Sequence, residues 1–315
     1  MPRIQPVNPR YRRIYHALSG PDLAVSENSG LSLEDLGLAN AEASREDLVF
    51  GTYSPEGLER ALRAYGLFQR VEERVGPLEL RVRCTDPFRP RITFWSRRYY
   101  APVADLELRR TTGAEVGLGD ALAATPLLYL DSLLLQNPGR AFDWHRPPLP
   151  GQNHPGLKLA RHILDVLLLM ARRIGAEALA LTPSTFASAC VYDRRFLFVD
   201  GAAQGRFLAL RQAGQHLPRW LHAWAVELRC MRDEQGQTAA FKPSPMLSPQ
   251  TARLGQYFDA NAWDDALQLE ARRQLTLDVE ALQGCFPWKR MPPGPPPGRV
   301  AELLGYDPLA PVVAH

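Results

Sequence analysis

Residues 151–200, GQNHPGLKLARHILDVLLLMARRIGAEALALTPSTFASACVYDRRFLFVD, decide the fold. They predict a helix from Pro155 to Gly175, because proline suits the first helical turn and glycine the position just past the last. A short apolar strand at 178–181, a brief helix ending at Tyr192 and a second strand at 196–199 follow. With a strand before the helix, this order indicates a βαβ crossover.

The start of this helix has the character of an anion site. The N–H groups of Gly156, Leu157 and Lys158 would lack helical partners there, and the helix dipole favours negative charge. Gly156 would let a phosphate approach the backbone closely. The positive charge of Lys158 is unfavourable at this end of the helix dipole, and a bound anion would offset that cost. The alternative is that Lys158 faces solvent and the fold tolerates the small cost.

A polar stripe runs along the predicted helix, opposite a wide apolar face. Arg161 and Asp165 lie on it at a spacing that allows them to pair. His162 lies on the same stripe, so we assign it no catalytic role.

The segment Leu127–Leu135, LLYLDSLLL, predicts the preceding strand. Its nearly continuous apolar run is typical of a central strand buried on both faces. Asp131 interrupts this apolar run. At such a position its carboxylate must be hydrogen-bonded or ion-paired, or its pKa must be raised. Two roles are open for Asp131: a structural aspartate, or a general base in the middle of the sheet. The loop at 140–155, with Trp144 and several prolines, either walls a pocket or forms a rigid surface connection.

Upstream, the pattern predicts a helix followed by an antiparallel meander. Ser54-Pro55 is a helix start, and the apolar face continues to about Arg74. Period-two alternation over 78–84, 91–95 and 104–110 indicates three strands with one solvated face. The predicted class is α+β, a mostly antiparallel central sheet flanked by helices, with helical extensions at both ends.

Three regions are expected along the chain: an arm and loop region at 1–50, a core at 51–245 and a mostly helical extension at 246–315. Within the first, residues 22–47 predict loop with short helical turns. In the last third, a hairpin over 226–231 and 238–241 could supply a further strand of the sheet. The helices expected there, with a proline-rich linker at 291–298, lie at 204–212, 218–225, 266–282 and 299–304.

Composition excludes several classes of protein. The chain has 315 residues, a net charge of +3 and four cysteines without a CxxC pair. These features indicate neither a nucleic-acid partner nor a zinc site or disulfide framework. No apolar run is long enough to span a bilayer and the N-terminus lacks a secretory signal, so we expect a cytoplasmic protein.

The order of elements over about 78–200 resembles the Gcn5-related N-acetyltransferase (GNAT) superfamily. There, an antiparallel run leads into a central strand whose backbone holds the pantetheine arm of acetyl-CoA. A turn of the form (Arg/Gln)-x-x-Gly-x-(Gly/Ala) opens a long helix and binds the pyrophosphate, and a tyrosine on the next short helix protonates the departing thiolate. The string PLPGQNHPGL is also similar to one in a group of bacterial proteins of unknown activity.

This resemblance implies a role for several positions. The central strand would be 127–135, the turn 153–158 and the acid Tyr192, with Asp131 accepting the amine proton directly or through a water. Phe196 stands where the tyrosine motif has its glycine, Asn153 replaces the usual Arg or Gln, and Lys158 replaces the second small residue. The residues implied for acetyl-CoA, or another acyl-CoA, are Leu133, Leu134, Leu135, Gln136, Gln152, His154, Gly156, Leu157 and Lys158.

The sequence therefore predicts an acyl-CoA-dependent N-acyltransferase acting by direct transfer to a small-molecule or peptide amine. The alternative is a non-catalytic binding or scaffold protein that keeps the fold. The degenerate turn favours the alternative, and the placement of Tyr192 and Asp131 favours the enzyme. The C-terminal extension could cover the acceptor site, form a homodimer interface or pack on the N-terminal helices.

Overall fold

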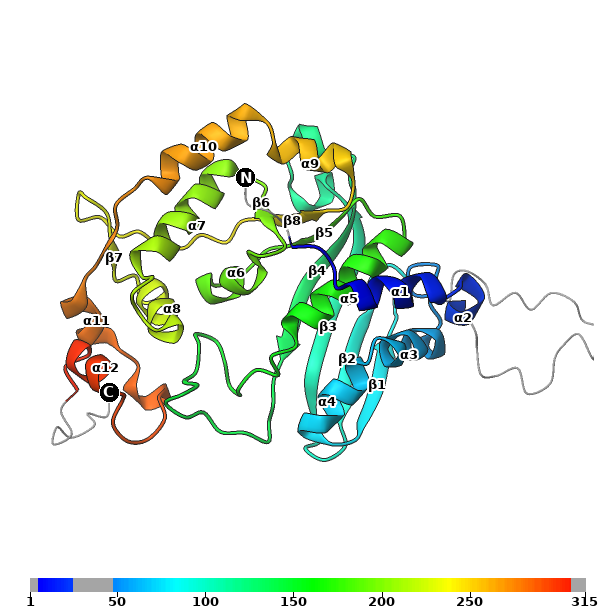
Figure 1. Cartoon of the computed structure of the whole chain (residues 1–315), viewed down its shortest axis with the longest axis horizontal. Helices are drawn as coiled ribbons and strands as arrows, with labels where there is room; N and C mark the ends of the chain where they lie inside the picture. The colour runs from blue at the N-terminus through cyan, green and yellow to red at the C-terminus, as the bar shows by residue number, and fades with distance from the viewer. Residues whose placement is uncertain (1–4, 25–47, 307–315) are drawn as a thin grey trace, which may run out of the picture.

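A seven-stranded sheet forms the centre of the computed structural model, which describes residues 5–24 and 48–306 (Figure 1). Its strand order is β1-β2-β3-β4-β5-β8-β6, in which β4 and β5 are parallel and every other neighbouring pair is antiparallel. The predicted α+β class is confirmed. The strands are β1 (Leu78–Arg83), β2 (Arg91–Ser96), β3 (Ala101–Thr112), β4 (Pro126–Leu135), β5 (Ala178–Leu181), β6 (Leu197–Phe198) and β8 (Met246–Pro249).

Helices surround this sheet, and a separate two-stranded pair, β7 (Met231–Arg232) with β9 (Thr276–Leu277), lies apart from it. None of the helices in the described ranges combines the length and apolar character that a membrane crossing requires. They are α1 (Pro9–Ala17), α2 (Gly20–Ala24), α3 (Pro55–Ala64), α4 (Leu67–Val75), α5 (Ala160–Arg173), α6 (Phe186–Tyr192), α7 (Gly201–Ala213), α8 (Arg219–Glu227), α9 (Ala252–Phe258), α10 (Asn261–Ala271), α11 (Val279–Cys285) and α12 (Gly298–Leu303).

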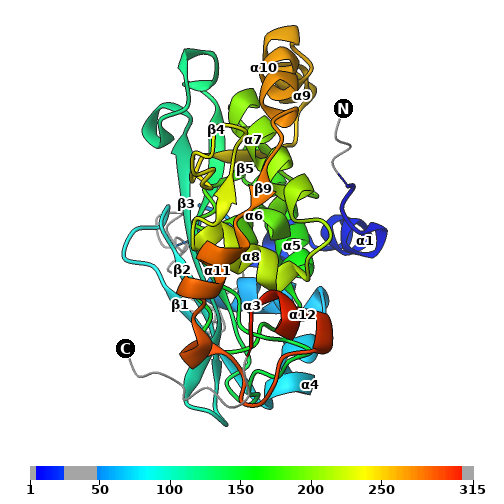
Figure 2. The ribbon, with the colours of Figure 1, turned by 90° about the vertical axis from the view of Figure 1, so that its left-hand side faces the viewer.

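The predicted meander is present in β1 to β3, and one of its faces is solvated. Ion pairs such as Arg91–Asp105 and Arg109–Asp131 lie on this open face, while the helices lie on the other side (Figure 2). The predicted single helix from 54 to 74 is wrong. Ser54 caps α3 as expected, but Gly66 adopts a left-handed conformation, at φ 73°, and divides the segment into α3 and α4.

Two apolar clusters cover the two faces of the sheet. The larger packs α3, α4 and α5 against one face, where Leu128, Leu130 and Leu179 lie. The smaller packs α9 and α10 against the opposite face at β4, β5 and β8, through Leu127, Tyr129 and other residues. The parallel half of the sheet is therefore covered on both sides and the meander on one.

The helix that follows β4 begins later than predicted. α5 starts at Ala160 with Leu159 as its cap, not at Pro155, and it ends before Gly175 as expected. Leu157 and Leu159 are each 1% exposed, so the core holds the segment before the helix in place. The predicted polar stripe also differs: Asp165 is buried and pairs with Arg195 after α6, so the expected pairing with Arg161 is wrong.

The last third of the chain departs most from the prediction. The expected hairpin is present only as a short turn, in which Arg232 pairs antiparallel with Thr238, and it does not join the central sheet. β8 inserts between β5 and β6 instead, so the sheet extends past the predicted boundary at 245. The helix expected at 266–282 is in fact the end of α10, then β9, then α11. Of the expected loop at 22–47, residues 22–24 belong to α2, and 25–47 lie outside the described residues.

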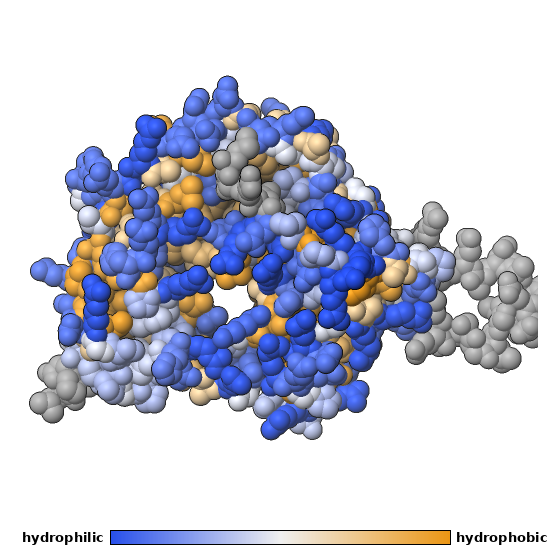
Figure 3. Space-filling view, viewed as in Figure 1, coloured by the Kyte–Doolittle hydropathy of each residue, from blue (hydrophilic) through white to orange (hydrophobic). Residues whose placement is uncertain are grey.

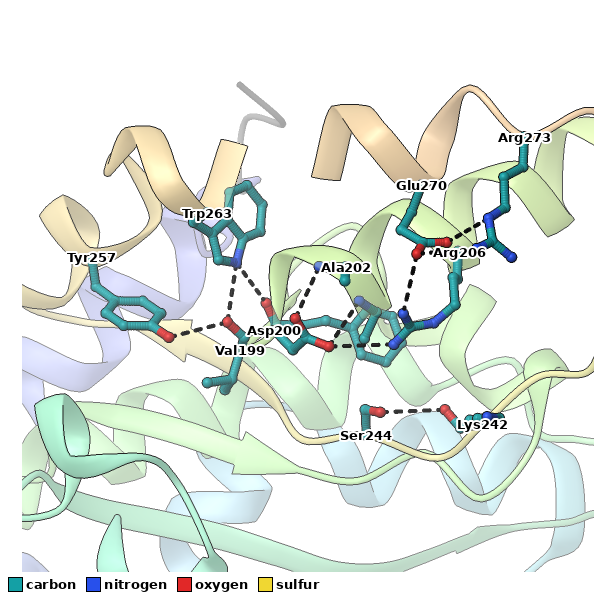
Figure 4. A network of polar contacts seen from close by, with 12 residues as sticks. Val199, Asp200, Ala202, Arg206, Lys242, Ser244, Tyr257, Trp263, Glu270 and Arg273 are labelled. Carbon is teal, nitrogen blue, oxygen red and sulfur yellow. Dashed lines mark hydrogen bonds and ion pairs between the residues drawn. The ribbon is translucent and has the colours of Figure 1, made fainter. Parts of the chain in front are cut away.

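α9 and α10 are fixed to the edge of the sheet by polar contacts at the end of β6 (Figure 4). The Trp263 indole N–H donates to the carbonyl oxygens of Phe198 and Val199 at 3.2 and 3.1 Å. α7 lies so close to α10 that a Cβ atom on Gly201 or Gly205 would come within 2.2 or 2.4 Å of backbone oxygens of α10. This glycine pair therefore allows the C-terminal helices to join the core.

The far C-terminal segment packs against the loop at 140–155. The Trp144 indole N–H donates to the carbonyl oxygens of Pro293 and Gly294, and that of Trp224 donates to Pro148. Nearby, the thiols of Cys230 and Cys285 are 3.6 Å apart without a disulfide. The described part of the tail therefore packs on this loop and on α8, a packing that the sequence did not predict.

Candidate functional site

The two halves of β4 differ in their neighbours. Residues 127–130 pair with β3 on one side and β5 on the other, and all four are buried. Beyond Leu130, β4 continues to pair with β3, but its other edge has no strand partner in the described structure. The expectation that the whole strand is buried on both faces is therefore wrong for its second half.

A bulge at Asp131 marks the change between the halves. Leu130 lies opposite Leu108 and Ser132 opposite Glu107, which leaves Asp131 as the extra residue. A bulge shifts the alternation of side chains by one position. As a result, Leu133 and Leu135 pack against the same core cluster as Leu128 and Leu130.

The open half of β4 forms one wall of a cleft of about 780 Å³. The turn at 152–158 forms a second wall, and α6 and the loop at 142–150 close the rest. The cleft is lined by Tyr192 and by all nine residues implied for the cofactor: Leu133, Leu134, Leu135, Gln136, Gln152, His154, Gly156, Leu157 and Lys158. The fold thus brings these residues together from three separate segments.

The turn is attached directly to the end of β4. The Asn137 N–H donates to the Pro155 carbonyl oxygen at 2.7 Å, and the Leu149 N–H donates to Gln152 Oε1 at 3.1 Å. A Cβ atom on Gly156 would lie 3.6 Å from the Leu135 carbonyl oxygen, an ordinary contact. Gly156 is therefore not required by the fold, although it leaves open space in the cleft.

The start of α5 adjoins the same cleft. Leu159 makes no side-chain cap, and no described group accepts from the N–H groups of Ala160, Arg161 or His162. Lys158, just before the helix, has a left-handed backbone with φ 57°, which is rare for a residue with a side chain. This conformation turns the chain so that Leu157 and Leu159 reach the core while Lys158 stays exposed beside the cleft.

Tyr192 ends α6, which starts with a capping box between Thr185 and Ser188. Its ring packs edge-on against Phe196, with ring centres 6.0 Å apart. Burial raises the pKa of the Tyr192 hydroxyl to about 12, because the phenolate would lose its hydration. The side chain therefore keeps its proton at neutral pH and can act as a hydrogen-bond donor or an acid.

Asp131 is not brought to the cleft. Its carboxylate accepts from Arg109 Nε at 3.1 Å on the open face of the sheet, and its side chain is 37% exposed. Arg109 also lies over the ring of Tyr129. Of the roles left open for Asp131, its position accounts for the structural one, a paired carboxylate at a bulge.

The charges around the cleft are all of one sign. Arg146, Lys158 and Arg219 line it, with His154, and no carboxylate of the described residues does. Nor do the described residues include any group of three or more His, Cys, Asp or Glu side chains that could hold a metal ion. A lining of this kind suits an anionic organic ligand.

Sequence reasoning missed part of the lining. Thr185 and Ser188 of α6 and Arg219 and Trp220 of α8 also face the cleft. The bulge could have been read from the segment LLYLDSLLL, since leucines at 128 and 130 and again at 133 and 135 share a face only if one residue between them is extra. The contribution of α8 has no local signal, because it depends on packing between distant segments.

Comparison with protein-family models and with curated proteins gives no match to this chain.

Proposed function

We propose that the protein is an acyl-CoA-dependent N-acyltransferase that moves an acetyl group, or another acyl group, to an amine by direct transfer. The observation that carries the proposal is the freed edge of β4, next to a turn and helix start with unpartnered N–H groups. An extended ligand that contains amides can pair with such an edge as an added strand would. The pantetheine arm of CoA is a ligand of that kind.

The turn at one end of the cleft matches the pyrophosphate of acyl-CoA, and the edge of β4 matches its acyl end. The turn at 152–158, the start of α5 and Lys158 offer N–H groups and positive charge to the pyrophosphate. The acyl end would lie along Leu133–Leu135, where backbone N–H groups could polarise the thioester carbonyl. Tyr192 lines the same cleft, so in this proposal it faces the thioester sulfur.

The transfer needs two proton movements. The amine nitrogen attacks the thioester carbon, a C–N bond forms, and the C–S bond breaks to release a thiolate. Tyr192 gives its proton to the thiolate, and the amine gives one to a base. Asp131 points away from the cleft, and His154 lies in the turn that would hold the pyrophosphate, so the amine proton would pass to solvent water.

The non-catalytic alternative has two observations in its favour. The carboxylate expected to act as base is paired with Arg109 on the open face of the sheet. In addition, Lys158 stands where the resembling turn has a small residue, and it lines the cleft. A protein of this kind would bind acyl-CoA without turning it over.

Unfolding with and without acetyl-CoA tests the proposal first. A ligand at 100 times its Kd stabilises a folded protein by about 2.7 kcal/mol, so a clear rise in Tm is expected. Binding that is followed by CoA release in the presence of a panel of amines supports the enzyme. Binding without release across the panel supports the alternative, and an unchanged Tm at millimolar acetyl-CoA contradicts both.

A further inference from the structure

A second cavity, of about 710 Å³, lies on the other side of α6 from the cleft. It is bounded by the first turns of α5, the turn after α6, the end of α7 and the start of α8. Leu149, Ala187, Val191 and Arg219 line both the cleft and this cavity. Figure 3 shows an opening through the molecule beside α5 and α6, and the four shared residues show that the two spaces adjoin each other.

The cavity is rich in arginine, and part of that charge is not neutralised. Two of its arginines are paired: Arg195 with Asp165, and Arg211 with Asp193. The other three, Arg161, Arg194 and Arg219, have no carboxylate within ion-pair distance among the described residues. Three arginines without a described carboxylate partner surround one space. Their combined positive charge favours an anion that carries more than one negative charge.

His222 adds to the cavity a buried polar atom that the fold leaves without a partner. Its side chain is 6% exposed, lines the cavity and packs against Phe186, and its Nε2 atom has no hydrogen-bond partner. Burial lowers the pKa of the ring to about 4, so the imidazole is neutral at pH 7. A buried polar atom without a partner is costly, and a ligand hydroxyl or N–H group would satisfy it.

We propose that this arginine cavity binds a phosphate monoester, held by Arg161, Arg194 and Arg219. A phosphate monoester carries about −1.5 to −2 charges at pH 7, more than a single carboxylate, and its oxygens accept bidentate hydrogen bonds from arginine forks. This proposal rests on the proposed function, and two molecules could then supply the phosphate. One is the acyl-CoA donor, whose ribose phosphate would reach the cavity through the opening beside α6. The other is an acceptor that carries a phosphate.

Binding of acetyl-CoA and of 3′-dephospho-acetyl-CoA, measured by calorimetry, separates the sources. If the donor supplies the phosphate, the dephospho form binds about tenfold or more weakly, the strength of a charge-assisted contact. Arg161→Ala and Arg194→Ala then weaken acetyl-CoA to that level without affecting the dephospho form. Arg172→Ala is the control, because Arg172 is also exposed and on α5 but lies outside the cavity.

If the acceptor supplies the phosphate, the two donors bind equally. Phosphoethanolamine then binds the wild-type protein, and binding is lost in Arg161→Ala and Arg194→Ala but not in Arg172→Ala. This arm needs no donor, so it still tests the cavity if acetyl-CoA does not bind at all. The inference is overturned if the donors bind equally and phosphoethanolamine does not bind, or if the cavity variants behave like Arg172→Ala.

Discussion

The two halves of β4 are both rich in leucine, yet they have different roles. Leu127–Leu130 are buried between two strands, whereas Leu133–Leu135 have a strand on one side and a cleft on the other. The difference arises from one extra residue at Asp131 and from β5 ending at Leu181. Apolar sequence alone therefore does not separate a core strand from a strand that presents its edge to a ligand.

The largest expected difference between the halves is in stability. Leu128→Ala should lower the free energy of unfolding by about 2–5 kcal/mol, because Leu128 is 0% exposed and its removal leaves a cavity. Leu134→Ala should cost less than about 1 kcal/mol, since Leu134 is 39% exposed. Urea unfolding of both variants measures this, and equal costs would contradict the division of β4.

The cleft beside the open half of β4 should support catalysis, and Tyr192 in its wall tests this. Tyr192→Phe should lower kcat by about 10²-fold, the lower range for loss of a general acid, while acetyl-CoA binding stays unchanged. Tyr100→Phe is the control, because Tyr100 is 81% exposed. The Tyr192 hydroxyl, with a pKa of about 12, loses its proton only at high pH. Any fall in kcat from its deprotonation should therefore begin above about pH 10. Equal kcat for Tyr192→Phe and the wild type would remove this residue from the mechanism.

Filling the space beside the open edge should weaken the donor. Gly156→Ala adds a methyl group with only ordinary contacts to the protein, so stability should change by less than about 1 kcal/mol. Acetyl-CoA binding should weaken about tenfold if a phosphate passes close to this backbone. Gly255→Ala, in α9 with open space around it, is the control for titration calorimetry. Unchanged affinity in Gly156→Ala would place the phosphates elsewhere.

The smallest effect is expected at the residue that divides the two halves. Asp131→Asn should cost at most about 1 kcal/mol, as for other exposed ion pairs, and should leave kcat unchanged. A large fall in kcat with unchanged stability would instead show that Asp131 reaches the reacting amine.

The sequence predicted most of this architecture where local patterns dominate. The strands β1 to β3, the Ser54 cap and the Gly175 stop each reflect short-range preferences, and the structure has them. The start of α5 was misplaced because Pro155 suits a helix start and a turn equally well. Burial of Leu157 and Leu159 decides between them, and that depends on the tertiary fold.

The site was predictable in part for the same reason. The turn at 152–158 and Tyr192 lie close to the crossover in sequence, so the order of elements placed them near one cleft. Insertion of β8 and the arginine cavity could not be predicted, because the first depends on a segment of four residues and the second on charges from separate elements.

Hydrogen exchange resolved by residue, with and without acetyl-CoA, shows directly whether the freed half of β4 holds the donor. New protection of amides is expected within Leu133–Leu135 and at the start of α5, while Leu127–Leu130, already paired on both sides, should stay unchanged. Binding with no added protection along 133–135 would contradict the proposal that this half of β4 holds the donor.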